Sequence, residues 1–424
     1  MTLLELPYGQ GALPFHAPSE RLEAVLGPSP LPASGADPAG IVRQALDHPL
    51  FSPTLRELAR GKKRVTLITS DHTRPMPSAI TLPVMLEEIR RGNPDASITV
   101  LVGTGMHRPT TREEMEAKFG RALTAKENIV VHRAQCEDDL VCLGRLPSGG
   151  ELWINRLVAQ SDLVVSEGFI EPHFFAGFSG GRKSILPGVA GWKTVLYNHN
   201  AGFIADERAR QGILESNPIH RDMQYAAQAA GLRFILNVLL DADKRIAAAV
   251  AGDPQAAHEE GCRLCLAHSR VPAVTADVVF TTNGGYPLDQ NLYQTVKSMT
   301  AAEACVRPGG VIVVCAELRE GHGGQAFYDW LAQRGSAAET ERDILSIPPQ
   351  STRMDQWQAQ ILARVMQKAV CVVVTDESRR ALVEGMHLRW APNPDAALRL
   401  ADDLVGQDAR LCVIPDGVGV IVTP

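Results

Sequence analysis

The chain has 424 residues, of which 45% are hydrophobic and 21% charged, so it is long enough for two domains with separate cores. Its formal net charge is −6, from 42 Lys and Arg against 48 Asp and Glu, and no block of like charges indicates a nucleic-acid partner. No apolar run approaches the roughly 18 residues of a membrane span, and the start lacks the pattern of a secretory signal. We therefore expect a cytoplasmic protein without membrane or nucleic-acid partners.

Short β-branched runs alternate with segments of helical apolar spacing, which predicts an α/β fold with mostly parallel sheets. An opening hairpin at residues 2–17 and a proline-rich passage at 28–38 come first. The elements predicted next, in chain order, are a helix at 41–59, a strand at 64–69, a helix at about 81–91, a strand at 97–103, a helix from about 111, a strand at 128–132, a turn at 144–151, a short helix at 152–160 and a strand at 162–168.

The same alternation continues to the end of the chain, with a domain boundary predicted near residue 270. This gives an N-terminal domain of residues 1–270 and a C-terminal domain of 271–409, with 410–424 as candidates to rejoin the first domain. The remaining predicted elements are a helix at 217–230, a strand at 234–240, a helix at 258–268, a strand at 276–282, a helix that includes 293–297, and strands at 310–315, 369–375, 410–415 and 418–423.

Polar clusters follow three of the predicted strands. Residues 70–75 read SDHTRP, residues 105–110 read GMHRPT, and the long cluster EPHFFAGFSGGRKSILPG spans 171–188. Ligands bind at the carboxyl ends of strands in open α/β sheets. Arg74 is placed to bind a phosphate or carboxylate at a helix N-terminus, and His107 is a candidate acid/base group. A helix cap for Asp71 and a plain surface charge for Arg74 explain the first cluster equally well.

The glycine-rich stretch after residue 168 does not have the spacing of a P-loop. That motif places glycine directly before the lysine, whereas here Gly177 and Gly181 enclose three residues and Arg182 precedes Lys183. A surface turn with two solvated cations is the plain alternative. The sequence therefore argues against a kinase or ATPase site, although a nucleotide-dependent phosphotransferase that uses this loop stays the competing enzyme class.

Single residues elsewhere carry weaker signals. His199 has no cysteine or carboxylate three or four residues away, so a closed zinc site is not indicated, although one imidazole suits a metal held mainly by another ligand. Cys262 and Cys265 form a lone CxxC pair, for which we expect no metal or redox role. Tyr293 and Lys297 are four residues apart and can share a helical face with Gln294, as can the residues of any solvated helix.

Taken together, five ordered clusters resemble the nickel-pincer lactate racemase family over nearly the whole chain. They are SDHTRP at 70–75, GMHRPT at 105–110, the cluster at 171–188, NH at 198–199 and YQTVK at 293–297. The resemblance implies two α/β domains with the active site in a cleft between them. It also implies a cofactor, a pyridinium-3-thioamide-5-thiocarboxylic acid mononucleotide that holds nickel through one carbon and two sulfurs and is loaded with the help of other enzymes.

The resemblance assigns roles by position. Lys183 matches the lysine that tethers the cofactor and His199 the protein ligand to nickel, while His107 and His173 match the acid/base pair. The positions that match further cofactor contacts are Ser70, Asp71, Thr73, Arg74, Pro187 and Gly188. The positions that match substrate contacts are Arg74, Tyr293, Gln294 and Lys297, and guesses for pocket walls are Phe174, Phe175 and Trp357.

The implied reaction is racemisation of a 2-hydroxy acid. One histidine takes the hydroxyl proton while hydride passes from C2 to the cofactor, and return of the hydride to either face of the keto acid gives either enantiomer. We expect lactate or another short aliphatic acid as substrate. Epimerisation of a sugar acid with the same cofactor and a non-catalytic cofactor-binding protein of the same fold are the alternatives. The sequence does not indicate an oligomeric state.

Overall fold

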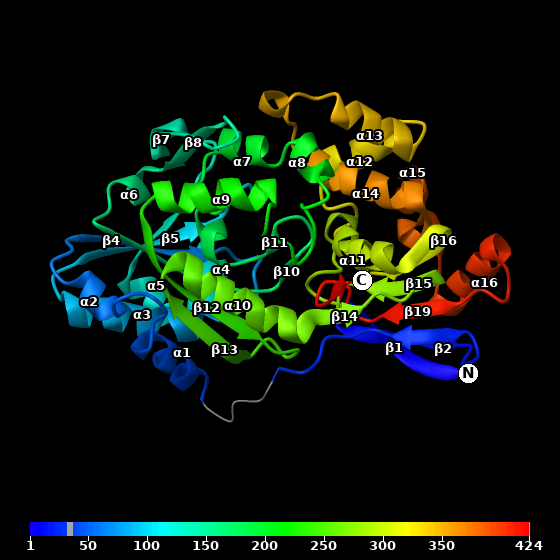
Figure 1. Cartoon of the computed structure of the whole chain (residues 1–424), viewed down its shortest axis with the longest axis horizontal. Coiled ribbons are helices and arrows are strands. Elements are labelled where there is room, and N and C mark those ends of the chain that lie inside the picture. The colour runs from blue at the N-terminus through cyan, green and yellow to red at the C-terminus, as the bar shows by residue number, and fades with distance from the viewer. Residues whose placement is uncertain (32–36, 424) are drawn as a thin grey trace. The chain divides into compact units, whose positions relative to one another are not determined.

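The structure is a computed structural model that describes residues 1–31 and 37–423. The proline-rich passage at 28–38 thus lies partly outside the described residues. The chain divides into two compact units (Figure 1). Unit 1 comprises Met1–Ser29, His199–Ala205 and Ser269–Pro424, and unit 2 comprises Pro30–Asn198 and Asp206–His268.

Unit 2 is built on a six-stranded sheet with the order β13-β12-β9-β4-β5-β6. All neighbours are parallel except β12 and β13, which are antiparallel. The strands are β4 (Arg64–Ser70), β5 (Ser97–Gly103), β6 (Asn128–Val131), β9 (Leu163–Phe169), β12 (Leu232–Leu240) and β13 (Ile246–Gly252). In the central strands β4 and β9 the β-branched and leucine side chains are buried on both faces, as expected for a parallel sheet covered by helices.

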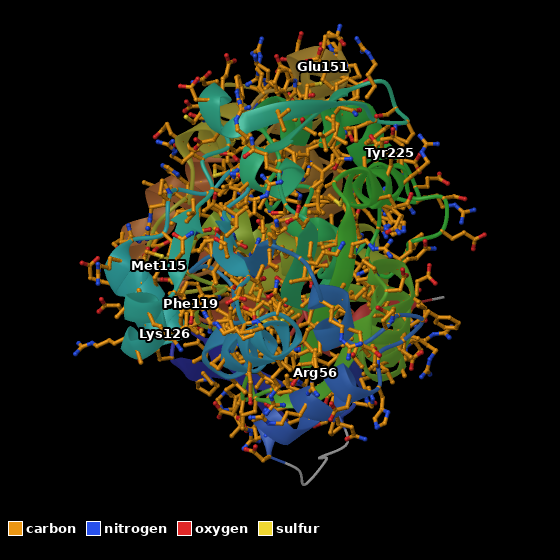
Figure 2. All side chains as sticks on the ribbon, turned by 90° about the vertical axis from the view of Figure 1, so that its left-hand side faces the viewer. Arg56, Met115, Phe119, Lys126, Glu151 and Tyr225 are labelled. Atoms are coloured by element: carbon orange, nitrogen blue, oxygen red, sulfur yellow. The ribbon has the colours of Figure 1, made fainter. Side chains whose placement is uncertain are left out.

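Helices that pack on the sheet complete the core of unit 2. The helix α1 packs on β12 and β13, and α3 packs on β9 (Figure 1). Figure 2 shows Met115 and Phe119 on α4 and Lys126 on α5; Phe119 is buried in the core and Met115 packs against it. The helices are α1 (Pro38–Asp47), α2 (Leu55–Ala59), α3 (Ser78–Gly92), α4 (Arg112–Phe119), α5 (Arg121–Lys126), α6 (Arg156–Ala159), α7 (Trp192–Asn198), α9 (Pro218–Ala229) and α10 (Pro254–Ser269).

Small antiparallel pairs complete unit 2 beside its main sheet. They are β7 (Leu140–Arg145) with β8 (Glu151–Asn155), and β10 (Pro172–His173) with β11 (Gly177–Phe178). Two 3-10 turns are η1 (Glu137–Asp139) and η2 (Gly181–Ser184).

Unit 1 has its own six-stranded sheet, entirely parallel, with the order β18-β17-β16-β15-β19-β3. The strands are β3 (Leu22–Val25), β15 (Ala276–Thr282), β16 (Val306–Cys315), β17 (Ala369–Val374), β18 (Arg389–Ala391) and β19 (Leu411–Ile414). The hairpin of β1 (Thr2–Tyr8) and β2 (Gly11–Ala17) adds Leu6 and Phe15 to the core of this sheet. The predicted α/β class with mostly parallel sheets is therefore confirmed.

The helices of unit 1 include two that carry predicted site residues, α11 and α14. The full set is α8 (Ala201–Ala205), α11 (Leu292–Cys305), α12 (Gln325–Ala332), α13 (Ala337–Leu345), α14 (Gln356–Lys368), α15 (Arg380–Gly385) and α16 (Pro394–Val405), with 3-10 turns η3 (Pro349–Ser351) and η4 (Glu377–Arg379). A short parallel pair joins β14 (Arg270–Pro272) to β20 (Ile421–Thr423). In the part of the chain that the structure describes, no helix is long and apolar enough to cross a membrane.

Two of the predicted helices differ from the structure. The helix predicted at 41–59 is two helices, because the chain leaves α1 after Asp47, Leu50 pairs with Gly252, and Thr54 caps α2. The helix predicted at 152–160 is the strand β8 followed by α6, because Leu152 and Ile154 point into the core as alternate strand residues.

Residues 410–424 do not rejoin the N-terminal domain. The strand β19 pairs with β15 and β3, and β20 pairs with β14, so this segment is part of unit 1. The first 29 residues also belong to unit 1, which makes the predicted domain of residues 1–270 too wide at its start.

Candidate active site

Two of the polar clusters meet at one edge of the unit 2 sheet. The strands β4 and β5 are parallel neighbours with Ser70 opposite Gly103 at their carboxyl ends. The chain therefore continues from β4 into 71–75 and from β5 into 104–110 on the same side. This places two predicted groups, Asp71 and His107, in direct contact.

Asp71 and His107 form a carboxylate–imidazole pair. His107 Nδ1 lies 2.6 Å from Asp71 Oδ2, and Asp71 Oδ1 accepts hydrogen bonds from the backbone N–H and the hydroxyl of Thr73, at 3.0 and 2.6 Å. Asp71 is only 2% exposed, whereas the His107 side chain is 39% exposed. The buried carboxylate thus holds one nitrogen of the ring while the rest of the ring reaches solvent.

The pKa of Asp71 reflects this arrangement. Burial on its own would raise the pKa, but the His107 hydrogen bond, the charges of His107 and Arg74 and the Thr73 hydroxyl together lower it well below the ordinary value. Asp71 is therefore an anion throughout the neutral range. A carboxylate at Nδ1 fixes the orientation of a histidine and stabilises the imidazolium that forms when the ring takes a proton.

The loop that carries Arg74 is hydrogen-bonded to Lys118 of α4. Lys118 Nζ donates to the backbone oxygen of Arg74 at 2.8 Å. Burial lowers the pKa of Lys118 to about 8, and the carboxylates of Glu167 and Asp71 act against this decrease. Sequence reasoning missed Lys118, because nothing in its local pattern distinguishes it from the other lysines on helix surfaces.

Glu167 is a second buried carboxyl group, on the strand next to β4. It lies on β9 and accepts hydrogen bonds from the hydroxyls of Thr69 at 2.6 Å, Ser78 at 2.5 Å, and Thr81. Burial raises the pKa of Glu167, while these hydroxyls and the Lys118 charge lower it in part. The network joins β4, β9 and α3 below the loop that carries Asp71.

This raised pKa predicts a specific pH dependence of stability. The folded chain holds the Glu167 proton more tightly than the unfolded chain, so the free energy of unfolding falls as pH rises above the unfolded pKa of Glu, with a slope of at most about 1.4 kcal/mol per pH unit. In Glu167→Gln this contribution is absent. Denaturant titrations between pH 5 and 8 should show the wild type losing stability relative to the variant.

The exposed Glu137 provides the matched control, because its side chain is 78% exposed. Glu137→Gln should follow the wild type across the pH range. Parallel curves for wild type and Glu167→Gln would show that Glu167 ionises equally in both states.

The glycine-rich cluster folds back on itself after β9. The hairpin of β10 and β11 carries His173, and the chain then enters η2 with Arg182 and Lys183. The N–H of Gly181 donates to Asn237 Oδ1 at 2.8 Å, and a Cβ at this position would lie 2.6 Å from the ring of His258. The loop is therefore packed against protein side chains and does not have the open amide cradle of a phosphate loop.

Arg182 and Lys183 occupy different environments. Arg182 is 1% exposed and donates to Ala176 O at 2.6 Å and, through Nη1, to His258 Nε2 at 2.7 Å. Lys183 is half-buried, with its ammonium 5.7 Å from the centre of the Phe175 ring. The plain alternative, a surface turn with two solvated cations, does not hold, because the structure buries the arginine as part of the support and leaves only the lysine accessible.

Backbone segments pack closely just after Lys183. The N–H of Gly105 donates to Gly188 O at 2.9 Å, and a Cβ at Gly103 would lie 3.1 Å from that same oxygen. Gly105 also lies against Pro187. The segment 183–188 is thus held against the carboxyl end of β5, close to the turn that carries His107.

Gly188 is expected to tolerate no side chain. A Cβ there would lie 2.3 Å from Ser184 O and 3.0 Å from Lys183 O. Overpacking of this kind typically costs about 1–3 kcal/mol, and we expect Gly188→Ala to lower the free energy of unfolding by that amount in denaturant titrations. Gly27→Ala is the control, because a Cβ at Gly27 meets nothing within 4 Å; equal stability of the two variants would contradict the expectation.

A cavity of about 490 Å³ borders His107 in unit 2. Two arginines in its wall, Arg108 and Arg133, pair with Glu114 and Asp139. The lining comes from the loops that follow β5 and β6 and consists of Gly105, Met106, His107, Arg108, Pro109, His132, Arg133, Ala134, Gln135 and Cys136.

Unit 1 brings together a second set of predicted residues. His199 lies between α7 and α8, 5% exposed, and its ring meets that of Trp357 edge-on with 5.2 Å between centroids. Trp357 Nε1 donates to Tyr293 Oη at 3.0 Å. Gln360 Nε2 donates to Ala201 O at 2.9 Å and so fixes the start of α8. Side chains of α14 therefore hold the segment that contains His199.

Tyr293, Gln294 and Lys297 lie on the less buried side of α11. All three are partly exposed, while their neighbours Thr295 and Val296 are buried. The Gln294 side-chain oxygen is buried without a hydrogen-bond partner among the described residues.

Among residues 1–31 and 37–423, no group of three or more His, Cys, Asp or Glu side chains is arranged to hold a metal ion. None of the eight cysteines, all of which are described, forms a disulfide bond.

Two protein-family models match most of the chain. Residues 8–212 match the model of the lactate racemase N-terminal domain, and residues 271–422 match that of the lactate racemase C-terminal domain. The chain belongs to the lactate racemase family. It is therefore an isomerase of the racemase class, and the resemblance inferred from the five clusters is confirmed.

Individual relatives of the family are similar over nearly their full length. A lactate racemase of Thermoanaerobacterium thermosaccharolyticum is 48% identical over 426 residues, which covers 100% of this chain and 99% of the relative. A lactate racemase of Lactiplantibacillus plantarum is 49% identical over 381 residues, 90% of each chain. The solved structure of the lactate racemase apoprotein from T. thermosaccharolyticum matches with a TM-score of 0.97 at 48% identity, covering both chains completely.

A more distant structure shares the fold alone. A protein of Thermotoga maritima matches with a TM-score of 0.64 at 17% identity, covering 88% of this chain and 99% of that one.

Proposed function

We propose that this racemase interconverts the enantiomers of lactate or another short aliphatic 2-hydroxy acid by reversible removal of hydride from C2. The observation that carries the proposal is the Asp71–His107 pair, 2.6 Å apart, within a fold whose relatives are named lactate racemases. A histidine backed by a carboxylate is a suitable acceptor for the hydroxyl proton that must leave when hydride leaves C2.

The residues fit the nickel-pincer mononucleotide as cofactor. Lys183 is accessible at the end of a firmly packed loop and offers an amine for a thioamide link, and His199 offers one imidazole to nickel. Ser70 Oγ is buried at the carboxyl end of β4 without a hydrogen-bond partner among the described residues, as expected for a group that awaits a polar ligand. Thr73 and Arg74 on the adjoining loop, with Pro187 and Gly188, are the further proposed contacts.

When bound, this cofactor supplies the acceptor for the hydride of C2. The chain itself handles the proton and the carboxylate of the substrate. His107 takes the hydroxyl proton, with His173 as its proposed acid/base partner, and Arg74 binds the carboxylate. In unit 1 we assign substrate contacts to Tyr293, Gln294 and Lys297, whose hydroxyl, amide and ammonium groups suit carboxylate and hydroxyl oxygens.

The surroundings of the two histidines differ in polarity, which leaves a second candidate substrate class. His173 packs against Phe174 and Phe175, with ring centroids at 5.0 and 4.5 Å, and this favours a short aliphatic acid. The lining of the cavity beside His107 includes two arginines and a glutamine, which would suit the hydroxyls of a sugar acid. The phosphotransferase alternative is set aside, because the family is one of racemases.

A substrate panel tests the proposal. The chain, co-produced with cofactor-synthesis enzymes, is incubated with single enantiomers of lactate, 2-hydroxybutyrate and a sugar acid, and the products are separated by chiral chromatography. We expect lactate to reach an equal mixture of enantiomers from either side. Conversion of the sugar acid alone would establish the second candidate, and no conversion by protein shown to be loaded would contradict both.

A further inference from the structure

We propose that the two histidines of this site are held as opposite tautomers of the neutral ring. His107 carries its proton on Nδ1 and presents an unprotonated Nε2, whereas His173 carries its proton on Nε2. His107 is then the resting proton acceptor and His173 a hydrogen-bond donor. The inference rests on the proposed function for its mechanistic meaning, but the tautomers themselves are a property of the chain alone.

For His107, the carboxylate determines which nitrogen holds the proton. Asp71 remains an anion, since its contacts lower its pKa, and an ionised carboxylate only accepts hydrogen bonds. At 2.6 Å from Asp71 Oδ2, Nδ1 of His107 must therefore donate. In the neutral ring the lone pair is then on Nε2.

For His173, a hydrogen bond from a backbone amide places the proton on the other ring nitrogen, Nε2. The N–H of Ala176 points at His173 Nδ1, at 3.3 Å. A backbone N–H only donates, so Nδ1 of His173 must be the acceptor and its proton in the neutral ring must lie on Nε2. Protonation of Nδ1 would set two N–H groups against each other.

The turn that presents this amide is held rigidly. Arg182, 1% exposed, donates from Nη2 to Ala176 O at 2.6 Å, so both the N–H and the C=O of residue 176 are hydrogen-bonded. Gly177 follows with φ +77°, and a Cβ there would lie 2.4 Å from Ile213 O. The amide of Ala176 is thus held in position from outside the hairpin.

The apolar surroundings of His173 also favour an uncharged ring. The His173 ring contacts the rings of Phe174 and Phe175, which also contact each other with 4.7 Å between centroids. Apolar packing of this kind disfavours a positive charge on the ring. His107, in contrast, has a buried carboxylate to balance its charge.

The consequence for the reaction is an unequal division of roles. When the substrate hydroxyl is deprotonated, its O–H bond breaks and an Nε2–H bond forms on His107, which becomes an imidazolium paired with Asp71. Nε2–H of His173 donates a hydrogen bond without giving up its proton, since loss of that proton from a neutral ring would leave an imidazolate. For His173 to deliver a proton, it must first gain one at Nδ1, and the turn 173–177 must then release the Ala176 contact.

Nitrogen-15 NMR of the histidine-labelled chain, without cofactor or substrate, tests the inference at neutral pH. Protonated and unprotonated ring nitrogens have well-separated shifts, and His107→Gln and His173→Gln assign the two rings by the signals that disappear. We expect protonated Nδ1 with unprotonated Nε2 for His107 and the reverse for His173. The same tautomer in both rings, or an imidazolium at His173, would overturn the inference whether or not the chain proves to be a racemase.

Two variants test whether the Asp71 carboxylate determines which nitrogen of His107 carries the proton. Asp71→Asn should change the His107 signals and leave those of His173 as they are. Thr73→Val removes the hydroxyl that donates to Asp71 but keeps the carboxylate, so both rings should keep the wild-type tautomers. An unchanged His107 ring in a folded Asp71→Asn protein would show that the carboxylate does not set its proton.

Discussion

Replacing His107 by glutamine is expected to lower kcat for lactate racemisation by about 10²- to 10⁴-fold, the usual contribution of a positioned acid/base group. Glutamine keeps a polar side chain of similar length but cannot accept the hydroxyl proton. Cofactor content should not change, because no role in holding the cofactor is assigned to His107. The measurement is the initial rate on each enantiomer by chiral chromatography, per loaded site as counted by nickel analysis.

The surface pair of His16 and Asp395 offers a matched control, since His16 Nδ1 lies 3.0 Å from Asp395 Oδ2 in the same kind of contact but on an exposed surface. His16→Gln should leave kcat at the wild-type value. Asp71→Asn, which keeps His107 but removes its carboxylate, should give a smaller loss of roughly 10- to 100-fold, as is typical for groups that orient a functional residue. Full activity of His107→Gln would remove it from the proposed mechanism.

Replacing Lys183 by alanine is expected to abolish the covalent cofactor adduct. Lys183 carries the only amine in the segment 171–188, and it is half-buried at the end of η2 while its neighbour Arg182 is enclosed. Intact mass of wild type from a co-producing host should exceed the polypeptide mass by that of the pincer nucleotide. The variant should show the bare polypeptide mass.

Lys193 on α7 provides the control for this experiment. Its side chain is 59% exposed and pairs with Glu137 at 3.1 Å, so Lys193→Ala should keep the adduct and the activity. Peptide mapping of wild type should place the added mass on the Lys183 peptide. An adduct that persists in Lys183→Ala would move the tether to another residue.

Much of the fold follows from local sequence pattern. β-branched runs such as those of β4, β5 and β9 are predicted within a residue or two, because such runs suit a sheet covered on both faces. The strand β13 was missed because IAAAVAG lacks the bulky residues that signal a strand. Pairing partners far apart in the chain, such as β3 with β19, depend on tertiary contacts that no local pattern reports.

Only part of the site was predicted, again because local sequence pattern does not report contacts between distant segments. The sequence placed Asp71 and His107 each after a strand, and parallel strand ends are where ligands bind. It did not show that β4 and β5 are neighbours, so the bond between the two side chains was not foreseen. The charged residues that support the site, Lys118, Glu167 and Arg182, were missed, because their placement depends on hydrogen-bond partners from other elements. The contact of His199 with Trp357 likewise joins residues 158 positions apart.

The most direct test of the central claim is racemisation of lactate that carries deuterium at C2, in ordinary water. If hydride leaves C2 and returns within the site, the product enantiomer should retain its deuterium, as measured by mass spectrometry after chiral separation. If C2 is instead deprotonated, the label should be lost to solvent as the enantiomers interconvert. Retention is the result that this account predicts, and loss of deuterium in step with racemisation would contradict it.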